Sequence, residues 1–545
     1  MSVGDIEGIE TDVLVLGGGA AGHAAALTAS DRGVRVMQLA KGAATTAIST
    51  GFLTFPVAGR FGRGELRKAL TEVTGKGLCD LALLDRFLEE GPKEISAVIE
   101  RCNILVDDAP RGLRARRAVG RRGRDLVGED YSVKGIRDMT SVVMEFSATH
   151  GTSLFTGLLK AVTAAPIERV RGEALRILPE GPTVAAIIDG RPVSITAGAI
   201  VLATGGVQGL YEFTDNPPGI VGDGQALALE AGAVLIDMEF IQFYPLALAE
   251  EGLPAIFIYP DFPPGGRIVN GSGEDLLQKH FDGAQTLGDF DNWDHLSVAM
   301  QREIMAGQTV HVDFSATDPK AWDEGSLTKL YLEKYIGNFR ERLVRVAPIA
   351  HYTIGGVRTN VECETAVPGL YAIGEVAGGM HGANRHGGAA LAEAVTFGCI
   401  AGRNAASRAQ NRGSLTRPSI DFELSKYGRQ FDVGAAMSVL RNRSQLSLGP
   451  LRDKHSLAAM GESLVEWREE AEEFGWNDLA GGTRIAGYKR SLKLADVMRQ
   501  FMMRRTESRG VHNRKDFPKS DDRWLKKQSM TLNCDGIATF DDLPV

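Results

Sequence analysis

Residues 11–41 read TDVLVLGGGAAGHAAALTASDRGVRVMQLAK, and they establish the class of fold. The apolar run at 13–16 predicts a strand, the glycines after it predict a tight turn, and the alanine-rich run at 24–30 predicts a helix. Gly33 ends that helix, and residues 34–39 predict a second strand. The segment is therefore a βαβ unit of about 30 residues, the setting in which a GxGxxG motif binds a dinucleotide.

Each position of the glycine motif has its own task in such a unit. Gly17 permits the tight turn, Gly19 lets the backbone approach a pyrophosphate, and Gly22 lets helix and strand pack closely. The helix that starts near Ala20 and Ala21 attracts phosphate with the positive end of its dipole. The alternative is a glycine-rich turn without a nucleotide, and the flanking strand and helix make it the poorer interpretation.

The second strand lacks the acidic residue that commonly binds an adenosine ribose. Residues 36–41 read VMQLAK and place Ala40 at that position. The absence weakens an NAD interpretation. It favours FAD, which many other contacts can hold.

Two later segments repeat the transition from strand to glycine. The apolar run at 199–203 is followed by TGG, and the run at 368–373 is followed by Gly374 and Glu375. Such separated strands predict one nucleotide-binding domain assembled from distant segments, with a further domain inserted near 241–350. Beyond residue 414, two stretches have apolar residues at helical spacing, which predicts a helical C-terminal domain; they are 457–473 and 488–504.

Composition describes a folded, water-soluble chain. Of the 545 residues, 43% are hydrophobic and 24% are charged, which is typical of globular proteins. The 61 basic and 69 acidic residues give a net charge of −8, which disfavours nucleic acid as a partner. No apolar run is long enough for a membrane span, and the acidic N-terminus does not resemble a secretion signal, so we expect a cytoplasmic protein without direct membrane insertion.

Cysteine spacing and one basic run bear on metals and partners. The five cysteines are scattered and form no CxxC pair, so we expect no metal site and no iron–sulfur cluster within the chain.

Seven arginines lie within residues 111–124. A solvated loop is the favoured interpretation of this run, and an anion or acidic-partner site is the alternative.

Longer motifs resemble one family over nearly the whole chain. They are ETDVLVLGGGAAGHAAA, VLATGG, VGDGQALALEAGA, DMEFIQFYP, PIAHYTIGGVRTN, GLYAIGEVAGGMHGANRHGGAALAEAVTFG and RTESRGVHNRKDFP. In order and content they resemble the flavoprotein subunits of succinate dehydrogenase and fumarate reductase, together with L-aspartate oxidase. The resemblance implies an α/β fold in which a Rossmann-like FAD-binding domain is built from discontinuous segments, with an α+β capping domain inserted and a helical C-terminal domain. The expected ranges are 1–240 and 351–412 for FAD binding, 241–350 for the capping domain, and 413–545 for the helical domain and tail.

The resemblance also implies which residues contact FAD. Glu375 would bind ribityl or ribose hydroxyls, and the helix beginning after Gly388 would direct its positive end at the flavin. A histidine that carries FAD covalently in many relatives is replaced by Thr45, so we expect non-covalent FAD. The expected cofactor-binding residues are Gly17, Gly19, Ala20, Ala21, Gly22, Lys41, Thr46, Gly51, Thr204, Gly205, Asp223, Gly374, Glu375, Arg385, Gly388, Ala389 and Leu391.

By the same resemblance, Arg385 would hold a substrate carboxylate and His351 would orient the substrate by a hydrogen bond. Tyr244 would line the pocket where relatives have a histidine. Residues 259–266 read YPDFPPGG and lack the glutamate of the family's proton relay. Trp293 stands where the family has its proton-shuttling arginine, and an indole is no general acid toward a carbanion.

These departures shape the functional hypothesis. We expect an FAD-dependent oxidoreductase that exchanges a hydride with a small anionic, carboxylate-bearing substrate other than succinate or fumarate, aided by an iron–sulfur partner subunit. Arg267, Arg302 and His295 remain open as replacements for the missing proton donor. The alternatives are an electron-relay subunit without its own substrate and a soluble oxidase like L-aspartate oxidase. A scaffold without flavin is the poorest alternative, and an oligomeric state is open.

Overall fold

The structure is a computed structural model of the whole chain. It describes residues 6–49, 53–56, 63–104, 106–107, 142–146, 151–178, 182–258, 263–281, 287, 293–322, 326–413, 420, 426–533 and 536–545. Gly51, Tyr259 and the arginine run at 111–124, all singled out from the sequence, lie outside the described residues.

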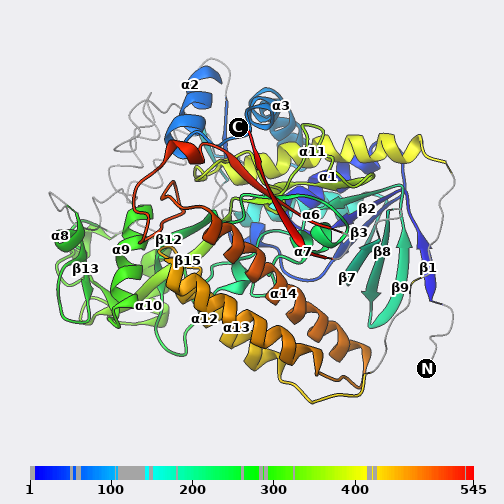
Figure 1. The fold of residues 1–545 in the computed structure, drawn as a ribbon. Coiled ribbons are helices and arrows are strands. Elements are labelled where there is room, and N and C mark those ends of the chain that lie inside the picture. The colour runs from blue at the N-terminus through cyan, green and yellow to red at the C-terminus, as the bar shows by residue number, and fades with distance from the viewer. Residues whose placement is uncertain are drawn as a thin grey trace.

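An eight-stranded sheet forms the centre of the molecule (Figure 1). Its order is β1-β9-β8-β7-β3-β2-β10-β17, and the pairs from β7 to β17 are parallel. The strands are β1 (Glu7–Glu10), β2 (Val13–Leu16), β3 (Val36–Ala40), β7 (Ile167–Leu178), β8 (Thr183–Ile188), β9 (Arg191–Thr196), β10 (Ala199–Leu202) and β17 (Leu370–Ala372). Leu202 pairs with Leu16 and with Ala372, so segments far apart in the sequence end at one edge.

Both faces of this sheet are covered, and the side chains of β2 show how. Val13 and Val15 are buried in the core that holds α1 and α11. Leu14 and Leu16 are buried in the core that holds α7 (Asp223–Glu230) and α14 (Leu479–Arg504). This alternation follows from the two-residue period of a strand. Figure 1 shows α11 along one side of the sheet and α14 along the other. The helices on the first face are α1 (Ala20–Ser30), α3 (Leu81–Arg101), α6 (Gly151–Ala164) and α11 (Ala389–Gln410).

Small residues let α1 and α11 approach each other closely. A side chain at Gly398 would lie 2.8 Å from the carbonyl oxygen of Ala21, and one at Gly402 would lie 2.5 Å from that of Ala25. Backbone contact at this distance leaves no room for a Cβ atom. The N-terminal βαβ unit is thereby fixed to a helix almost 400 residues later in the chain.

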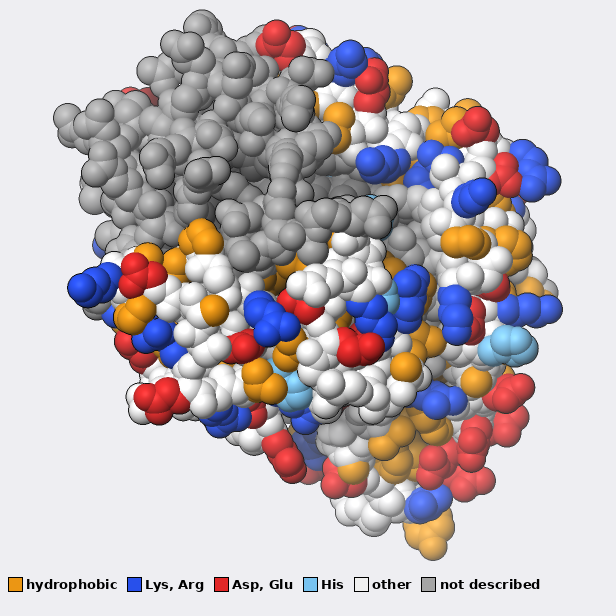
Figure 2. All heavy atoms as spheres, turned by 90° about the vertical axis from the view of Figure 1, so that its left-hand side faces the viewer, with side chains coloured by type: hydrophobic (Ala, Val, Ile, Leu, Met, Phe, Trp, Pro, Cys, Tyr) orange, Lys and Arg blue, Asp and Glu red, His pale blue; other side chains and the backbone are white. Residues whose placement is uncertain are grey.

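Residues 241–353 hold a second sheet with a core of its own. Its order β12-β15-β14-β13 is antiparallel throughout. The elements are β12 (Ile241–Leu248), β13 (Arg267–Asn270), α8 (Leu276–His280), α9 (Trp293–Met305), β14 (Val310–Asp313), α10 (Leu327–Tyr335) and β15 (Val344–Thr353). Figure 2 shows the face on that side of the molecule, where basic and acidic side chains are intermixed over the described part.

The C-terminal region is mainly helical, and the mixed α/β fold class with such a region is confirmed. The helices are α12 (Val433–Ser447), α13 (Lys454–Glu472) and α14 (Leu479–Arg504); α13 covers the predicted stretch 457–473 except its last residue, and α14 contains the stretch 488–504. Asp432, Asp453 and Asp478 cap their N-termini by accepting backbone hydrogen bonds.

The chain then forms two strands that periodicity did not predict, β18 (Lys527–Leu532) and β19 (Ala538–Leu543). They join β11 (Leu235–Ile236) and β16 (Gly356–Val357) in a four-stranded sheet. The tail thus packs against two short strands, one that precedes the inserted sheet in the chain and one that follows it. The remaining elements are β4 (Leu53–Phe55), α2 (Arg63–Lys68), β5 (Val106–Asp107), β6 (Val142–Phe146) and α7 (Asp223–Glu230).

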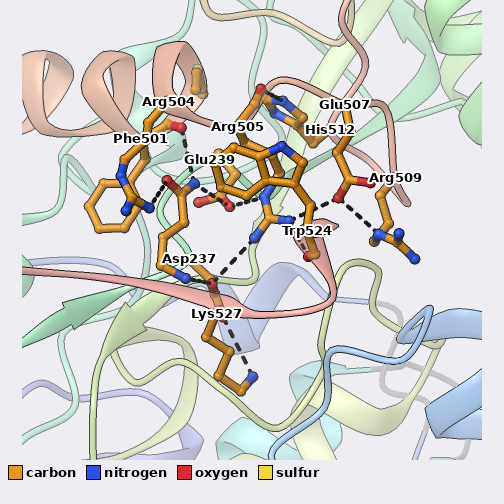
Figure 3. Close-up of polar contacts among 12 residues, drawn as sticks. Asp237, Glu239, Phe501, Arg504, Arg505, Glu507, Arg509, His512, Trp524 and Lys527 are labelled. Atoms are coloured by element: carbon orange, nitrogen blue, oxygen red, sulfur yellow. Dashed lines mark hydrogen bonds and ion pairs between the residues drawn. The ribbon is translucent and has the colours of Figure 1, made fainter. Parts of the chain in front are cut away.

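A buried cluster of charges fastens the tail to the start of the inserted segment (Figure 3). Arg505 is fully buried and forms ion pairs with Glu239 at 2.5 Å and Glu507 at 2.9 Å. Nearby, the Lys527 ammonium lies 3.5 Å from an oxygen of Asp237. Because each buried cation has a carboxylate partner, the cluster is a structural junction between distant segments.

In the part of the chain that the structure describes, no helix is both long and apolar enough to cross a bilayer.

Candidate active site

A cleft opens where the parallel strands of the central sheet end, and the empty space in it and at its mouth, open solvent included, is about 1780 Å³. In open α/β sheets, ligands bind at the carboxyl ends of the strands. The predicted residues that line it are Gly17, Gly19, Ala20, Ala21, Lys41, Thr46, Thr204, Gly205, Asp223, Gly374, Glu375, His351, Arg385, Gly388 and Leu391. Gly22 and Ala389 lie behind the wall, and Gly51 lies outside the described residues.

The glycines of the first turn divide into structural and ligand-facing positions. Gly17 has φ +128°, and a Cβ there would lie 2.0 Å from the carbonyl oxygen of Ala203. A Cβ at Gly22 would lie 2.3 Å from the oxygen of Gly17, so helix and strand touch at these two positions. A Cβ at Gly19 would lie 3.4 Å from the Thr46 hydroxyl, an ordinary contact. Packing does not demand a glycine at Gly19, but a ligand lying against the backbone would.

The N-terminus of α1 faces the cleft without a side-chain cap. Its first turn contains no acidic residue, and the Ala20 N–H donates to the Thr46 hydroxyl at 3.0 Å. Uncapped N–H groups and the helix dipole together favour a phosphate at this place. The helix α11 begins in the same wall, directly after Gly388, whose φ is +79°.

Four charged side chains meet at one part of the cleft. Lys41 lies 3.0 Å from both Glu173 and Asp223, and Arg490 of α14 lies 3.1 and 3.2 Å from the same two carboxylates. Burial opposes the charge on Lys41, yet Asp223 and Glu173 raise its pKa. The sequence pointed to Lys41 and Asp223 but not to Glu173 or Arg490, because no local motif connects β7 or α14 with the glycine turn.

Two polar groups in the wall bear on whether a cofactor fits. Burial raises the pKa of Glu375 to about 7, against hydrogen bonds from the Thr353 N–H and the Gln208 side chain that lower it. The Thr204 hydroxyl is buried in the same wall and has no hydrogen-bond partner among the described residues. Since buried polar groups are rarely left unpaired, this orphan hydroxyl fits a polar ligand such as a dinucleotide. The space beside Gly19, which the packing of the chain leaves open, also fits such a ligand.

Arg385 is the cation on another part of the wall. Its Nε donates to Gln242 at 3.0 Å, and its guanidinium lies 5.0 Å from the centre of the Tyr352 ring. Burial lowers the pKa of Arg385, while Tyr352 and Glu375 act in the opposite direction. Gln242 also donates to the Arg385 carbonyl at 3.1 Å, so β12 fixes this loop from the inserted sheet. Gln242 stands beside Phe243 and Tyr244 in the quoted DMEFIQFYP motif, which could have drawn attention to it.

His351 forms a second polar group at the cleft, with a carboxylate behind it. Its Nδ1 lies 2.6 Å from Asp215, and the ring of Phe257 stacks on the imidazole with centroids 5.9 Å apart. Tyr244 does not line the cleft; its ring packs on Phe257 at 4.4 Å and lies 6.4 Å from that of His351. The aromatic wall at this point is therefore Phe257, with Tyr244 behind it.

None of the three side chains left open as proton donors lines the cleft. Arg267 is half-exposed and paired with Asp275 at 3.1 Å, and Arg302 is exposed on α9. His295 is exposed in the first turn of the same helix. Trp293 begins α9, and its side chain lies outside the described part of the structure.

Fold and cleft define a class: a dinucleotide-binding oxidoreductase with a discontinuous Rossmann-like domain. The FAD binding domain profile matches residues 12–391, and the fumarate reductase flavoprotein C-term profile matches residues 438–541. The chain belongs to the FAD-dependent oxidoreductase family that contains the fumarate reductase flavoproteins and the L-aspartate oxidases. Its cofactor is FAD.

Individual relatives agree with this assignment. L-aspartate oxidase of Saccharolobus solfataricus is 28% identical over 93% of this chain and 96% of the relative. The fumarate reductase flavoprotein subunit of Escherichia coli is 31% identical over 65% of each chain. Among solved structures, a quinol-fumarate reductase with menaquinol molecules superposes with a TM-score of 0.83 at 25% identity, covering 99% of both chains. Sdh1 of Mycobacterium smegmatis in complex with UQ1 gives 0.80 at 22% identity, covering 99% of this chain and 95% of its own.

Proposed function

We propose that this flavoprotein exchanges a hydride with a small carboxylate-bearing substrate other than succinate or fumarate. The observation that carries the proposal is the distribution of cations. Among the described residues that line the cleft, Lys41 and Arg385 are the side chains with a permanent positive charge, and Lys41 is held between Asp223 and Glu173. This leaves Arg385 to bind a substrate anion. A dicarboxylate would need a second permanent cation beside it.

Arg385 is suited to clamp one carboxylate. Gln242 occupies its Nε, and Nη1 approaches the His386 carbonyl at 3.4 Å, so the planar group is held in one orientation. A buried guanidinium has lost its hydration and gains the more from an anion placed against it. Phe257, next to His351, gives the same region an apolar surface that suits a substrate with a partly apolar body.

FAD would be held without a covalent bond. The uncapped α1 would bind its pyrophosphate, and Asp223 and Glu375 lie where they can accept hydrogen bonds from sugar or ribityl hydroxyls. Thr45, at the position of the flavin-carrying histidine, instead donates to Asn216 at 2.8 Å. When bound, the flavin supplies the two-electron hydride chemistry.

We infer that electrons leave through a separate iron–sulfur subunit in the cytoplasm. The similar Escherichia coli protein is named as a subunit, and the cysteines of this chain lack the spacing of a cluster site. L-aspartate oxidases, which are equally similar over a larger share of the chain, make direct oxidation by oxygen the alternative. Peroxide formation on admitting air to the reduced protein would favour the oxidase, and copurification with an iron-containing protein would favour the subunit.

The test uses the purified flavoprotein under anaerobic conditions. Flavin absorbance is followed while oxidised or reduced protein is mixed with a panel of mono- and dicarboxylates. We expect turnover with a monocarboxylate, and a loss of about 10²- to 10³-fold in Arg385→Gln. Arg302→Gln, on the exposed face of α9, is the matched control and should keep the wild-type rate. A wild-type flavin that reacts with no acid, or an Arg385→Gln variant at full rate, would refute the proposal.

A further inference from the structure

A histidine and a carboxylate form a directed pair at the cleft. His351 Nδ1 lies 2.6 Å from an Asp215 oxygen, within the range of a short charge-assisted hydrogen bond. The imidazole comes from β15, whereas Asp215 comes from the segment between β10 and α7. Both residues line the cleft. The other ring nitrogen, Nε2, accepts or donates no hydrogen bond among the described residues and is the nitrogen left for a substrate.

The carboxylate is itself held in position. Asn216 donates from Nδ2 to the second Asp215 oxygen at 2.9 Å and to the His351 carbonyl at 3.2 Å. Thr45 donates to the Asn216 side-chain oxygen at 2.8 Å. Three segments, at residues 45, 215–216 and 351, therefore fix the direction of the imidazole. A histidine that only filled space would not need this support.

We propose that His351 exchanges the proton with the substrate carbon and that Asp215 is its positioning residue. This inference rests on the proposed hydride exchange with a carboxylate substrate. It assigns to the pair the proton step that the Trp293 position cannot perform. The described side chains that were open for this task, Arg267, Arg302 and His295, do not line the cleft.

The step balances in both directions. In reduction, an activated carbon–carbon double bond takes a hydride at one carbon from the reduced flavin, and the neighbouring carbon takes a proton from His351 Nε2. The product has gained two electrons and two hydrogens, and the neutral imidazole recovers its proton from solvent. In oxidation, Nε2 accepts the proton while the hydride leaves to oxidised flavin. Asp215 holds the imidazole through Nδ1 in either direction.

The other ionisable groups around the imidazole have other partners or tasks, which supports the assignment of the proton step to His351. Asp215 contacts it directly, and the Tyr244 ring lies near it behind Phe257. Glu375 and Arg385 line the same cleft. Neither takes the proton step in this scheme, since Arg385 binds the carboxylate and one Glu375 oxygen is bonded to Thr353 and Gln208.

Tyr352 also lines the cleft, but it is a poor acid. Burial, with Glu393 nearby, raises the pKa of its phenol well above the usual value. Its hydroxyl donates to Glu393 at 3.3 Å and lies 3.4 Å from His381. The phenol therefore retains its proton and serves as the surface beneath Arg385.

The experiment compares His351→Gln and Asp215→Asn with the wild-type holoenzyme, and His455→Gln, on an exposed turn of α13, is the control. We expect His351→Gln to lower kcat by about 10²- to 10⁴-fold, with the substrate dissociation constant, read from the flavin spectrum, changed far less. Asp215→Asn should lower kcat with the substrate dissociation constant little changed, because the imidazole loses the carboxylate that directs it. Asp215→Glu, which returns a carboxylate to this place, should restore part of the lost kcat.

The outcomes distinguish a failure of this inference from a failure of the proposed hydride exchange. A His351→Gln variant that keeps the wild-type kcat, or loses only substrate affinity, overturns the proton role and leaves hydride exchange standing. An Asp215→Asn variant that keeps the wild-type kcat, or an Asp215→Glu variant no faster than Asp215→Asn, overturns the positioning role. A wild-type protein that turns over no carboxylate overturns both proposals together.

Discussion

Replacing Arg505 with methionine tests the buried charge cluster of Figure 3. The guanidinium is fully buried, pairs with Glu239 and Glu507, and also donates to the carbonyls of Trp524 and Lys526 at 3.0 Å each. Methionine fills much of the same volume without these bonds. The variant therefore leaves the buried Glu239 without its arginine partner, whereas Glu507 keeps Arg509 at 2.9 Å.

The expected cost follows from this uncompensated charge. Breaking a buried ion pair from one side costs about 3–5 kcal/mol. Burial raises the pKa of Glu239 and Arg505 opposes that effect, so without Arg505 the carboxyl takes up a proton more readily, which limits the cost. For a cooperative unit of about 250 residues, this cost lowers the unfolding midpoint by roughly 6–10 °C.

The assay is thermal unfolding at a fixed scan rate, followed by flavin fluorescence, in a double-mutant cycle. Glu239→Gln keeps a neutral partner for Gln528, whose side chain donates to Glu239 at 2.8 Å. Combining it with Arg505→Met should cost less than the sum of the two single changes, by about 1–3 kcal/mol. Arg523→Met, which removes an exposed arginine paired with Asp521, should leave the midpoint unchanged. Strictly additive changes, or an unchanged midpoint in Arg505→Met, would refute the reasoning.

Three further predictions concern the cleft. Gly17→Ala should abolish FAD binding in purified protein, since its Cβ would collide with Ala203 at 2.0 Å, whereas Gly64→Ala, with nothing within 4 Å, should retain yellow protein. Because the folded pKa of Glu375 is raised to about 7, its contribution to stability is complete below about pH 4.5 and is lost as pH rises to 7, a change of about 3 kcal/mol. Unfolding midpoints between pH 4.5 and 8 should therefore fall less steeply in Glu375→Gln than in wild type, and parallel curves would contradict this. Acid precipitation should release all flavin into the supernatant, because Thr45 offers no imidazole for a covalent bond; a yellow pellet would show otherwise.

Local sequence patterns were enough to predict the fold class. The strand, glycine turn and helix at residues 13–30 depend on neighbours within one supersecondary unit, and so do the amphipathic helices α13 and α14. The strand pair β18 and β19 escaped detection because short strands without a clean alternation carry little periodic signal. Its partner strand β11 is about 290 residues away in the chain.

The motifs by themselves also named the residues expected at the cofactor, since spacing within a motif reflects one turn and one helix end. The amino-acid sequence thus determined the class of protein and the positions of Gly17, Asp223 and Arg385. Only the tertiary structure decided that Arg490 reaches Asp223 across 267 residues and that His351 meets Asp215 across 136. Such contacts depend on how whole elements pack, and a side chain reveals its distant partner only when the chain is folded.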